Sequence, residues 1–206
     1  NRAEEAGFDG VELHAANGYL LNEFLSDYFN QREDQWGGNI GKRIKFVAMV
    51  AKAAKAAAKD DFIVGIRLGQ ITVTDPDYQW PAMIKLVKAL KEAGVDYIHT
   101  TDTDVNRKPF KGGSAKTLAE IVQEFSDIPL IVNGGVDKSN YEHVAAHYPN
   151  AMLAIGKAAL ANPDLPKRLK SGDKIEDLDF AMLQPTATLE NEWKWRDEHD
   201  KHINDE

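Results

Sequence analysis

The chain has 206 residues, of which 43% are hydrophobic and 28% are charged, and its formal net charge at pH 7 is -8. This length can bury a core, and the acidic balance argues against surfaces that bind nucleic acid or anionic membranes, which need clustered lysine and arginine. Because the sequence contains no cysteine, disulfides, thiolate nucleophiles, zinc fingers and iron–sulfur clusters are excluded within it.

The first residues, Asn1 to Gly7, read as the last turn of a helix that ends at a glycine. A chain that begins inside a helix suggests a piece of a longer protein, so we expect a fragment. The N-terminus has no signal-peptide character, and no apolar run approaches the ~18 residues that a membrane span needs. We therefore expect a cytoplasmic protein.

Five short apolar segments predict strands. Each is mostly apolar rather than strictly alternating, which is typical of parallel strands covered on both faces. They are residues 10–14, 62–68, 95–100, 129–133 and 151–155. Helical patterns lie between and after them, at residues 44–59, 82–93, 117–125, 139–147, 164–169 and 191–202. This repeated alternation predicts an α/β fold with a parallel sheet.

A doubly wound sheet and a (β/α)8 barrel both fit this alternation, and two features favour the barrel. Polar residues and glycines follow each predicted strand, at Asn17-Gly18, Gly69-Gln70, Thr101-Asp102, Gly134-Gly135 and Gly156-Lys157. In a barrel these loops converge on the face that carries the active site. No G-x-G-x-x-G motif follows the first predicted strand, so a dinucleotide-binding sheet lacks its main support.

A complete barrel has eight strands and ~250 residues. We therefore expect a partial (β/α)8 TIM barrel of about five parallel βα units, strands 4 to 8, with strands 1 to 3 absent. The predicted domains are residues 1–172, the C-terminal part of the barrel, and residues 173–206, an acidic and partly helical extension. An open barrel exposes its first and last strands, so we also expect self-association through these edges.

Three polar side chains follow the first predicted strand: His14, Asn17 and Tyr19. His14 and Asn17 can both donate hydrogen bonds to one oxygen, as in an oxyanion hole. Tyr19 carries a phenol, which is protonated at neutral pH and can act as a general acid. A capped turn with a buried tyrosine is the alternative for any one of them, but all three together at a strand's carboxyl end favour a catalytic site.

The same segment carries a family resemblance. Residues 7–26 resemble the strand-four signature of the old yellow enzyme family, a Gly-Val-Glu-Ile-His-like strand followed by two residues, then His or Asn, then Gly-Tyr-Leu. The resemblance continues through residues 30–34 and 36–39, to Arg43 and Phe46, and again over residues 154–164. It spans roughly residues 7–169 in the family's order.

This resemblance implies an oxidoreductase that contains FMN, uses NADH or NADPH as reductant, and reduces an activated alkene or a similar small molecule with a conjugated carbonyl or nitro group. It implies that His14 and Asn17 bind the oxygen of that substrate and that Tyr19 supplies the proton. In the family the absent strands provide further flavin contacts. We therefore expect this chain alone to bind FMN weakly or not at all and to be inactive.

Five residues are candidates for the cofactor site. The family places an arginine near the flavin N1 and C2 carbonyl, where it stabilises the anionic reduced form, and Arg67 holds that position; a surface salt bridge is its alternative. Gly134-Gly135 and Gly156-Lys157 suit a phosphate, which barrels commonly hold at their last two loops. The family usually has Gly-Arg at the second loop, whereas lysine binds phosphate as a point charge without the bidentate fork.

Other readings stay open at this point. His143 and His147 stand four residues apart on a predicted helix, but no third ligand lies nearby, so we expect a solvated face rather than a metal site. A phosphate-binding barrel lyase or isomerase without flavin could use Gly134 and Gly156 and would not need Tyr19. A barrel fragment without catalytic activity is the third possibility.

Overall fold

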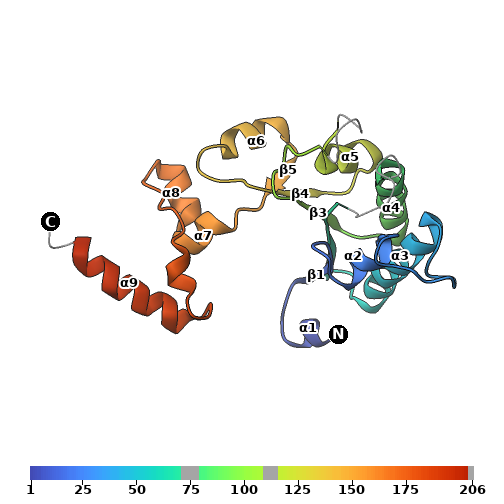
Figure 1. Ribbon diagram of the computed structural model, residues 1–206, viewed down its shortest axis with the longest axis horizontal. Helices are drawn as coiled ribbons and strands as arrows, with labels where there is room; N and C mark the ends of the chain where they lie inside the picture. The colour runs from blue at the N-terminus through green and yellow to red at the C-terminus, as the bar shows by residue number, and fades with distance from the viewer. Residues whose placement is uncertain (71–78, 109–115, 204–206) are drawn as a thin grey trace. The chain divides into compact units, whose positions relative to one another are not determined.

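The computed structural model describes residues 1–70, 79–108 and 116–203 (Figure 1). The chain groups into two compact units, Asn1–Ala154 and Ile155–Glu206. The predicted domain division after residue 172 stays a prediction. No helix in the described part of the chain is both long enough and apolar enough to span a bilayer.

The residues of the first unit that the structure describes form a sheet of five parallel strands. They are β1 (Gly10–Ala15), β2 (Ile63–Leu68), β3 (Tyr97–Thr101), β4 (Leu130–Asn133) and β5 (Ala151–Leu153). Each strand pairs with the next one along the chain, in the order β1-β2-β3-β4-β5. A doubly wound sheet reverses its order at a switch point, which the described strands lack. The prediction of about five parallel βα units of a barrel is confirmed.

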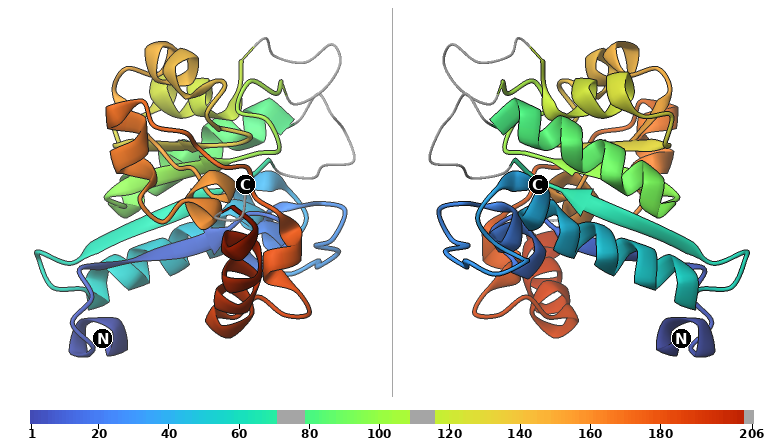
Figure 2. Two further views of the ribbon diagram at one scale, coloured as in Figure 1. Left: turned by 90° about the vertical axis from the view of Figure 1, so that its left-hand side faces the viewer. Right: turned by 90° about the vertical axis from the view of Figure 1, so that its right-hand side faces the viewer.

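Six helices in the described part of the first unit accompany this sheet. They are α1 (Arg2–Glu5), α2 (Leu20–Leu25), α3 (Ile40–Ala57), α4 (Gln79–Ala93), α5 (Leu118–Phe125) and α6 (Tyr141–His147). Helix α1 ends before Gly7, which has a φ of +83°, so the predicted terminal glycine is in place. Helices α3 and α4 run side by side along one face of the sheet (Figure 2).

Two helix starts show how caps set the boundaries. Helix α3 begins four residues before the predicted start at residue 44, because the Asn39 side chain accepts a hydrogen bond from Lys42 N–H at 3.2 Å and caps it. Thr117 and Glu120 form a reciprocal capping box at α5. Helix α2 was not predicted, because six residues are too few to show a helical period.

The two faces of the sheet differ in polarity. Val64, Ile66 and Leu68 are completely buried on the face that α3, α4 and α5 cover. Because side chains alternate along a strand, the residues between them face the other way. We call this opposite side the polar face, and its side chains are Glu12, His14, Arg67, Tyr97, His99, Thr101 and Asn133. The site candidates on the strands, His14 and Arg67, therefore lie on the polar face.

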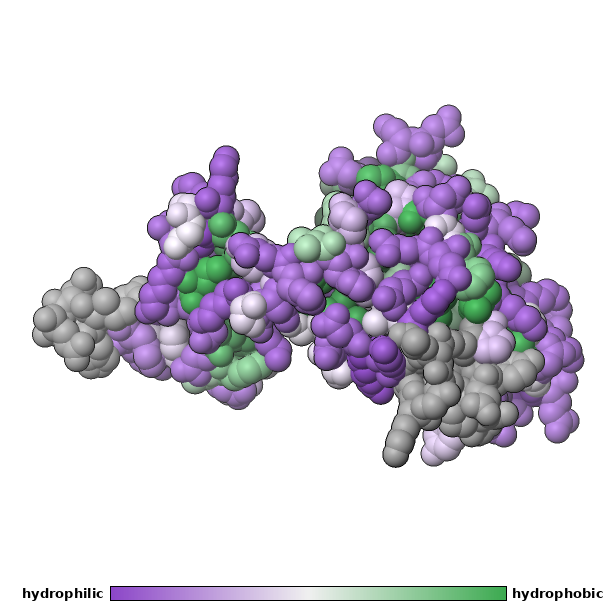
Figure 3. Space-filling view, turned by 90° about the horizontal axis from the view of Figure 1, so that it is seen from above, coloured by the Kyte–Doolittle hydropathy of each residue, from purple (hydrophilic) through white to green (hydrophobic). Residues whose placement is uncertain are grey.

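The second unit is helical. It contains α7 (Lys157–Ala161), α8 (Leu165–Ser171), the short 3-10 helix η2 (Phe180–Leu183) and α9 (Leu189–Ile203). The buried Asn162 donates to Ala158 O and Glu176 O, and Arg196 on α9 donates to Leu160 O at 3.3 Å. The predicted fifth strand, residues 151–155, was two residues too long, since β5 ends at Leu153. Hydrophilic residues dominate the surface seen in Figure 3, with apolar patches between them.

The ring of Tyr97 places a packing constraint on Gly65 that can be measured. A Cβ at position 65 would lie 2.0 Å from Cζ of Tyr97, so Gly65 is what lets this ring cross β2. Gly65→Ala should therefore lower the free energy of unfolding by roughly 1–3 kcal/mol, as overpacking does. Urea unfolding followed by circular dichroism measures it. In a Tyr97→Ala background the same substitution should cost much less, and an equal cost there would contradict the clash.

Candidate active site

The turn after β1 brings two of the predicted catalytic side chains together. Asn17 has a φ of +57° and Gly18 a φ of +76°, so two successive left-handed residues reverse the chain. The amide of Gly18 is held by the Asn22 side chain at 3.0 Å. The rings of His14 and Tyr19 then meet with centroids 4.8 Å apart and planes at 57°.

Each of these side chains can reach a ligand. Tyr19 is the residue before α2 and is 63% exposed, so its phenol is not the buried tyrosine of the alternative reading. Among the described residues, the side chains of His14 and Asn17 have no hydrogen-bond partner, and Asn17 is exposed. Two donors and one acid on a six-residue turn can bind an oxygen and protonate a neighbouring atom. The roles assigned to them remain predictions.

Arg67 lies on β2, and its guanidinium points to the polar face. Its Nη2 donates to Thr101 Oγ1 at 2.9 Å and to Asn133 Oδ1 at 3.0 Å. Thr101 Oγ1 also donates to Asn133 Oδ1 at 3.0 Å, and Asn133 Nδ2 donates to Ala154 O at 2.8 Å. Both partners of the guanidinium are thus neutral, and no ion pair between described residues involves Arg67. Within residues 1–70, 79–108 and 116–203, Arg67 therefore forms no surface salt bridge.

Thr101 and Asn133 were not singled out as site residues from the sequence. Both stand at the last position of their strands, where polar residues of a barrel gather. They are register partners of each other on β3 and β4. The alternation of each strand, counted back from the end, would have placed both on the same face as Arg67.

A second group on the polar face was also missed. Glu12 Oε2 lies 2.9 Å from His99 Nδ1, and the Tyr97 hydroxyl bonds to the same carboxylate. Burial, together with the charge of Glu12, raises the pKa of Tyr97 to about 12. Tyr97 therefore stays a phenol and donates to Glu12 throughout the physiological range.

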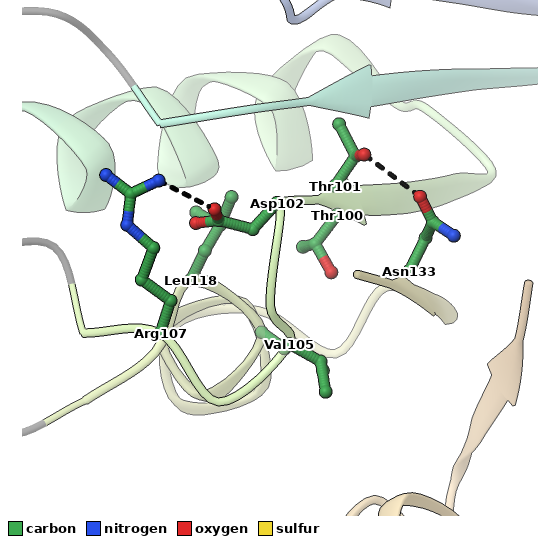
Figure 4. Close-up of a pocket in the computed structure, with 8 residues that line it drawn as sticks. Thr100, Thr101, Asp102, Val105, Arg107, Leu118 and Asn133 are labelled. Carbon is green, nitrogen blue, oxygen red and sulfur yellow. Dashed lines mark hydrogen bonds and ion pairs between the residues drawn. The ribbon is translucent and has the colours of Figure 1, made fainter. Parts of the chain in front are cut away.

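A small cavity lies beyond the carboxyl end of β3 (Figure 4). Asp102 accepts from Gln70 Nε2 at 2.6 Å and from Arg107 Nη1 at 3.0 Å. The cavity holds about 10 Å³, the space of roughly one water molecule. It is too small for a flavin or a substrate, so this group braces the loops after β2 and β3 rather than forming a binding site.

The predicted phosphate residues fall into both units. Gly134 has a φ of +150°, and a Cβ there would lie 2.7 Å from Val105 N. Gly135 has a φ of +60° and a Cβ there would lie 3.1 Å from Thr103 O. Both glycines are therefore required by the close packing of two loops, and phosphate binding by them stays a prediction.

Gly156 and Lys157 belong to the second unit, where they begin α7. Lys157 Nζ lies 5.8 Å from the centre of the Phe180 ring, a cation–π contact within that unit. In the first unit His147 Nε2 lies 3.1 Å from Glu120 Oε1 of α5. No group of three or more potential metal ligands occurs among the described residues.

Comparison with known proteins gives a consistent result. Residues 1–176 match the family model described as the NADH:flavin oxidoreductase / NADH oxidase family. The chain is 36% identical over 178 residues to a probable NADH-dependent flavin oxidoreductase, YqiG, of Bacillus subtilis (strain 168), covering 83% of this chain and 48% of the relative. It is 32% identical over 185 residues to the NADH:fumarate oxidoreductase of Klebsiella pneumoniae (strain 342), covering 85% of this chain and 20% of that protein.

A solved structure, the old yellow enzyme homologue from Zymomonas mobilis, superimposes with a TM-score of 0.75 at 26% identity, covering 92% of this chain and 53% of that one. The chain thus spans about half the length of this homologue and of YqiG. The resemblance to old yellow enzymes seen in the sequence is confirmed. The chain belongs to the NADH:flavin oxidoreductase / NADH oxidase family.

Proposed function

We propose that this chain forms part of an FMN-dependent NAD(P)H oxidoreductase that reduces an activated alkene. The observation that carries the proposal is the guanidinium of Arg67, held on the polar face by the neutral oxygens of Thr101 and Asn133. An arginine without a carboxylate partner keeps its positive charge available for an electron-rich ligand. Membership of the family supports flavin as that ligand.

The residues present fit a flavin. Both hydrogen bonds of Arg67 to described residues use Nη2, so Nη1 can donate to a carbonyl or to an anionic ring. Bound FMN would supply the hydride, and an arginine beside its pyrimidine edge would stabilise the reduced form. Gly134, Gly135, Gly156 and Lys157 are the proposed phosphate contacts.

The turn after β1 supplies the acceptor side of the reaction. We assign His14 and Asn17 as donors to the carbonyl or nitro oxygen, which makes the conjugated carbon more electrophilic. Tyr19 then protonates the neighbouring carbon, as its exposure next to His14 permits. The similarity to an NADH:fumarate oxidoreductase supports an alkene conjugated with a carbonyl group as the acceptor.

Flavin binding tests the role of Arg67. Since the chain spans about half the length of relatives such as YqiG, we expect the 206 residues alone to bind FMN weakly or not at all and to lack activity, so the test uses a longer flavin-binding protein that contains this chain. Arg67→Met should weaken that binding roughly 10- to 100-fold, the value of a charged hydrogen bond. Quenching of flavin fluorescence measures it. Arg107→Met is the matched control, because Arg107 is paired with Asp102, and it should bind like the unchanged chain.

The proton donor is tested in a flavin-loaded protein that contains this chain. Tyr19→Phe should slow reduction of a cyclic enone roughly 10²- to 10⁴-fold, the usual contribution of a general acid. It should leave flavin reduction by NADH unchanged, since that half-reaction needs no proton from Tyr19. Stopped-flow absorbance separates the two steps. Equal slowing of both would contradict the assignment, and the exposed Tyr28→Phe serves as control.

We also propose self-association through the sheet edges. In the described sheet β1 pairs only with β2 and β5 only with β4, so each leaves backbone groups open on its outer side. Met152 on β5 is 59% exposed, and a charge there should oppose edge pairing. Analytical ultracentrifugation should show association that Met152→Lys weakens and that Met49→Lys on α3 does not. A monomer at high concentration would rule the proposal out.

A further inference from the structure

Two buried nitrogen atoms on the polar face have no partner among the described residues. They are Nε of Arg67 and Nε2 of His99. The side chain of His99 is only 13% exposed. A buried polar atom without a hydrogen bond costs about 1–3 kcal/mol, so a pair of such atoms in one place calls for a physical explanation.

The path of the arginine places its side chain on the same face of β3 as His99. Arg67 starts on β2, but its Nη2 donates to Asn133 on β4, so its side chain has to cross β3. On β3 its register partner is His99. Neighbouring parallel strands lie about 4.8 Å apart, so the arginine side chain crosses β3 on the face that carries His99.

Glu12 determines which nitrogen of His99 carries the proton. Its Oε2 lies 2.9 Å from Nδ1, and a carboxylate only accepts, so Nδ1 is the protonated nitrogen. Tyr97 donates to the same carboxylate, which keeps Glu12 in place. In this tautomer Nε2 is an acceptor, whereas Nε of an arginine is always a donor. With the opposite tautomer, two N–H groups would face each other.

We propose that His99 is a positioning residue for Arg67 and that its Nε2 accepts the Nε–H of the guanidinium through one water molecule. Glu12 acts through His99 by fixing its tautomer. With Nη2 held by Thr101 and Asn133 and Nε held by His99, the plane of the guanidinium is fixed and Nη1 is left for the ligand. The inference rests on the proposed function only for the identity of that ligand.

Nuclear magnetic resonance on the chain without ligand tests the arrangement. The ¹⁵N shifts of His99 should show Nδ1 protonated and Nε2 bare. The Nε–H of Arg67 should exchange with solvent ~10-fold more slowly than that of the exposed Arg107, since a hydrogen bond protects it. His99→Leu should abolish this protection, and His99→Gln, which keeps one donor and one acceptor, should restore it.

Glu12→Gln gives a second test that leaves the imidazole in place. A glutamine can donate to Nδ1, so His99 should populate the other tautomer and the protection of Arg67 should fall. His143→Leu on the exposed side of α6 is the control and should change neither signal. A protonated Nε2 in the unchanged chain, or full protection of Arg67 in His99→Leu, would overturn the proposal.

FMN titration separates this inference from the proposed function. As a single substitution, His99→Leu should weaken FMN binding roughly 3- to 10-fold. In an Arg67→Met background it should have no further effect, because His99 acts through the arginine. Additive losses would contradict a role through Arg67. If a longer protein that contains this chain binds no FMN while the resonance results stand, the proposed ligand is wrong and the positioning role of His99 holds.

Discussion

The candidate site depends on one part-buried cation, Arg67, whose side chain spans three strands. Arg67 leaves β2 and is held by side chains of β3 and β4, and this is possible only because the three strands are parallel and in sequential order. Burying a guanidinium is costly unless its donors are satisfied. Thr101 and Asn133 satisfy Nη2 with neutral oxygens, so the charge is retained rather than neutralised. A carboxylate at either position would fix the arginine equally well but would neutralise its positive charge.

The same constraint divides the sheet into two faces with different tasks. The helix-covered face carries the buried aliphatic residues of β2 and β3, which supply the burial free energy of the first unit. On the polar face, Glu12 and Tyr97 lie in a lower row of register partners. Arg67 and His99 lie in the next row, nearer the carboxyl ends of the strands. Gly65 belongs to the lower row and makes room there for the ring of Tyr97. The buried aliphatic side chains and the polar side chains of the candidate site thus occupy alternate positions of the same strands.

The sequence was sufficient for the fold and for part of the site. Apolar segments located all five strands, and the run from His14 to Tyr19 located the turn, because both signals are local. The direction of the Arg67 side chain and its hydrogen-bond partners could not be predicted from the sequence. Thr101 and Asn133 lie 34 and 66 residues away in the chain, and only the pairing of strands brings them to the guanidinium. Short helices such as α2 and α7 were not predicted, because five or six residues are too few to show a helical period.

The glycines after β4 show that a sequence motif can have a packing role that only the structure reveals. Gly134-Gly135 suggested a phosphate cradle, yet contacts within the protein already account for both residues. A side chain at either position would press on the backbone of the loop after β3, where Val105 N donates to Gly134 O at 2.8 Å. That contact ties the loop after β4 to the one that carries Asp102, and Asn133 immediately before it holds Arg67. The glycines therefore contribute to the candidate site even before any phosphate is considered: they allow the loops after β3 and β4 to meet beside the strand ends whose side chains hold the arginine.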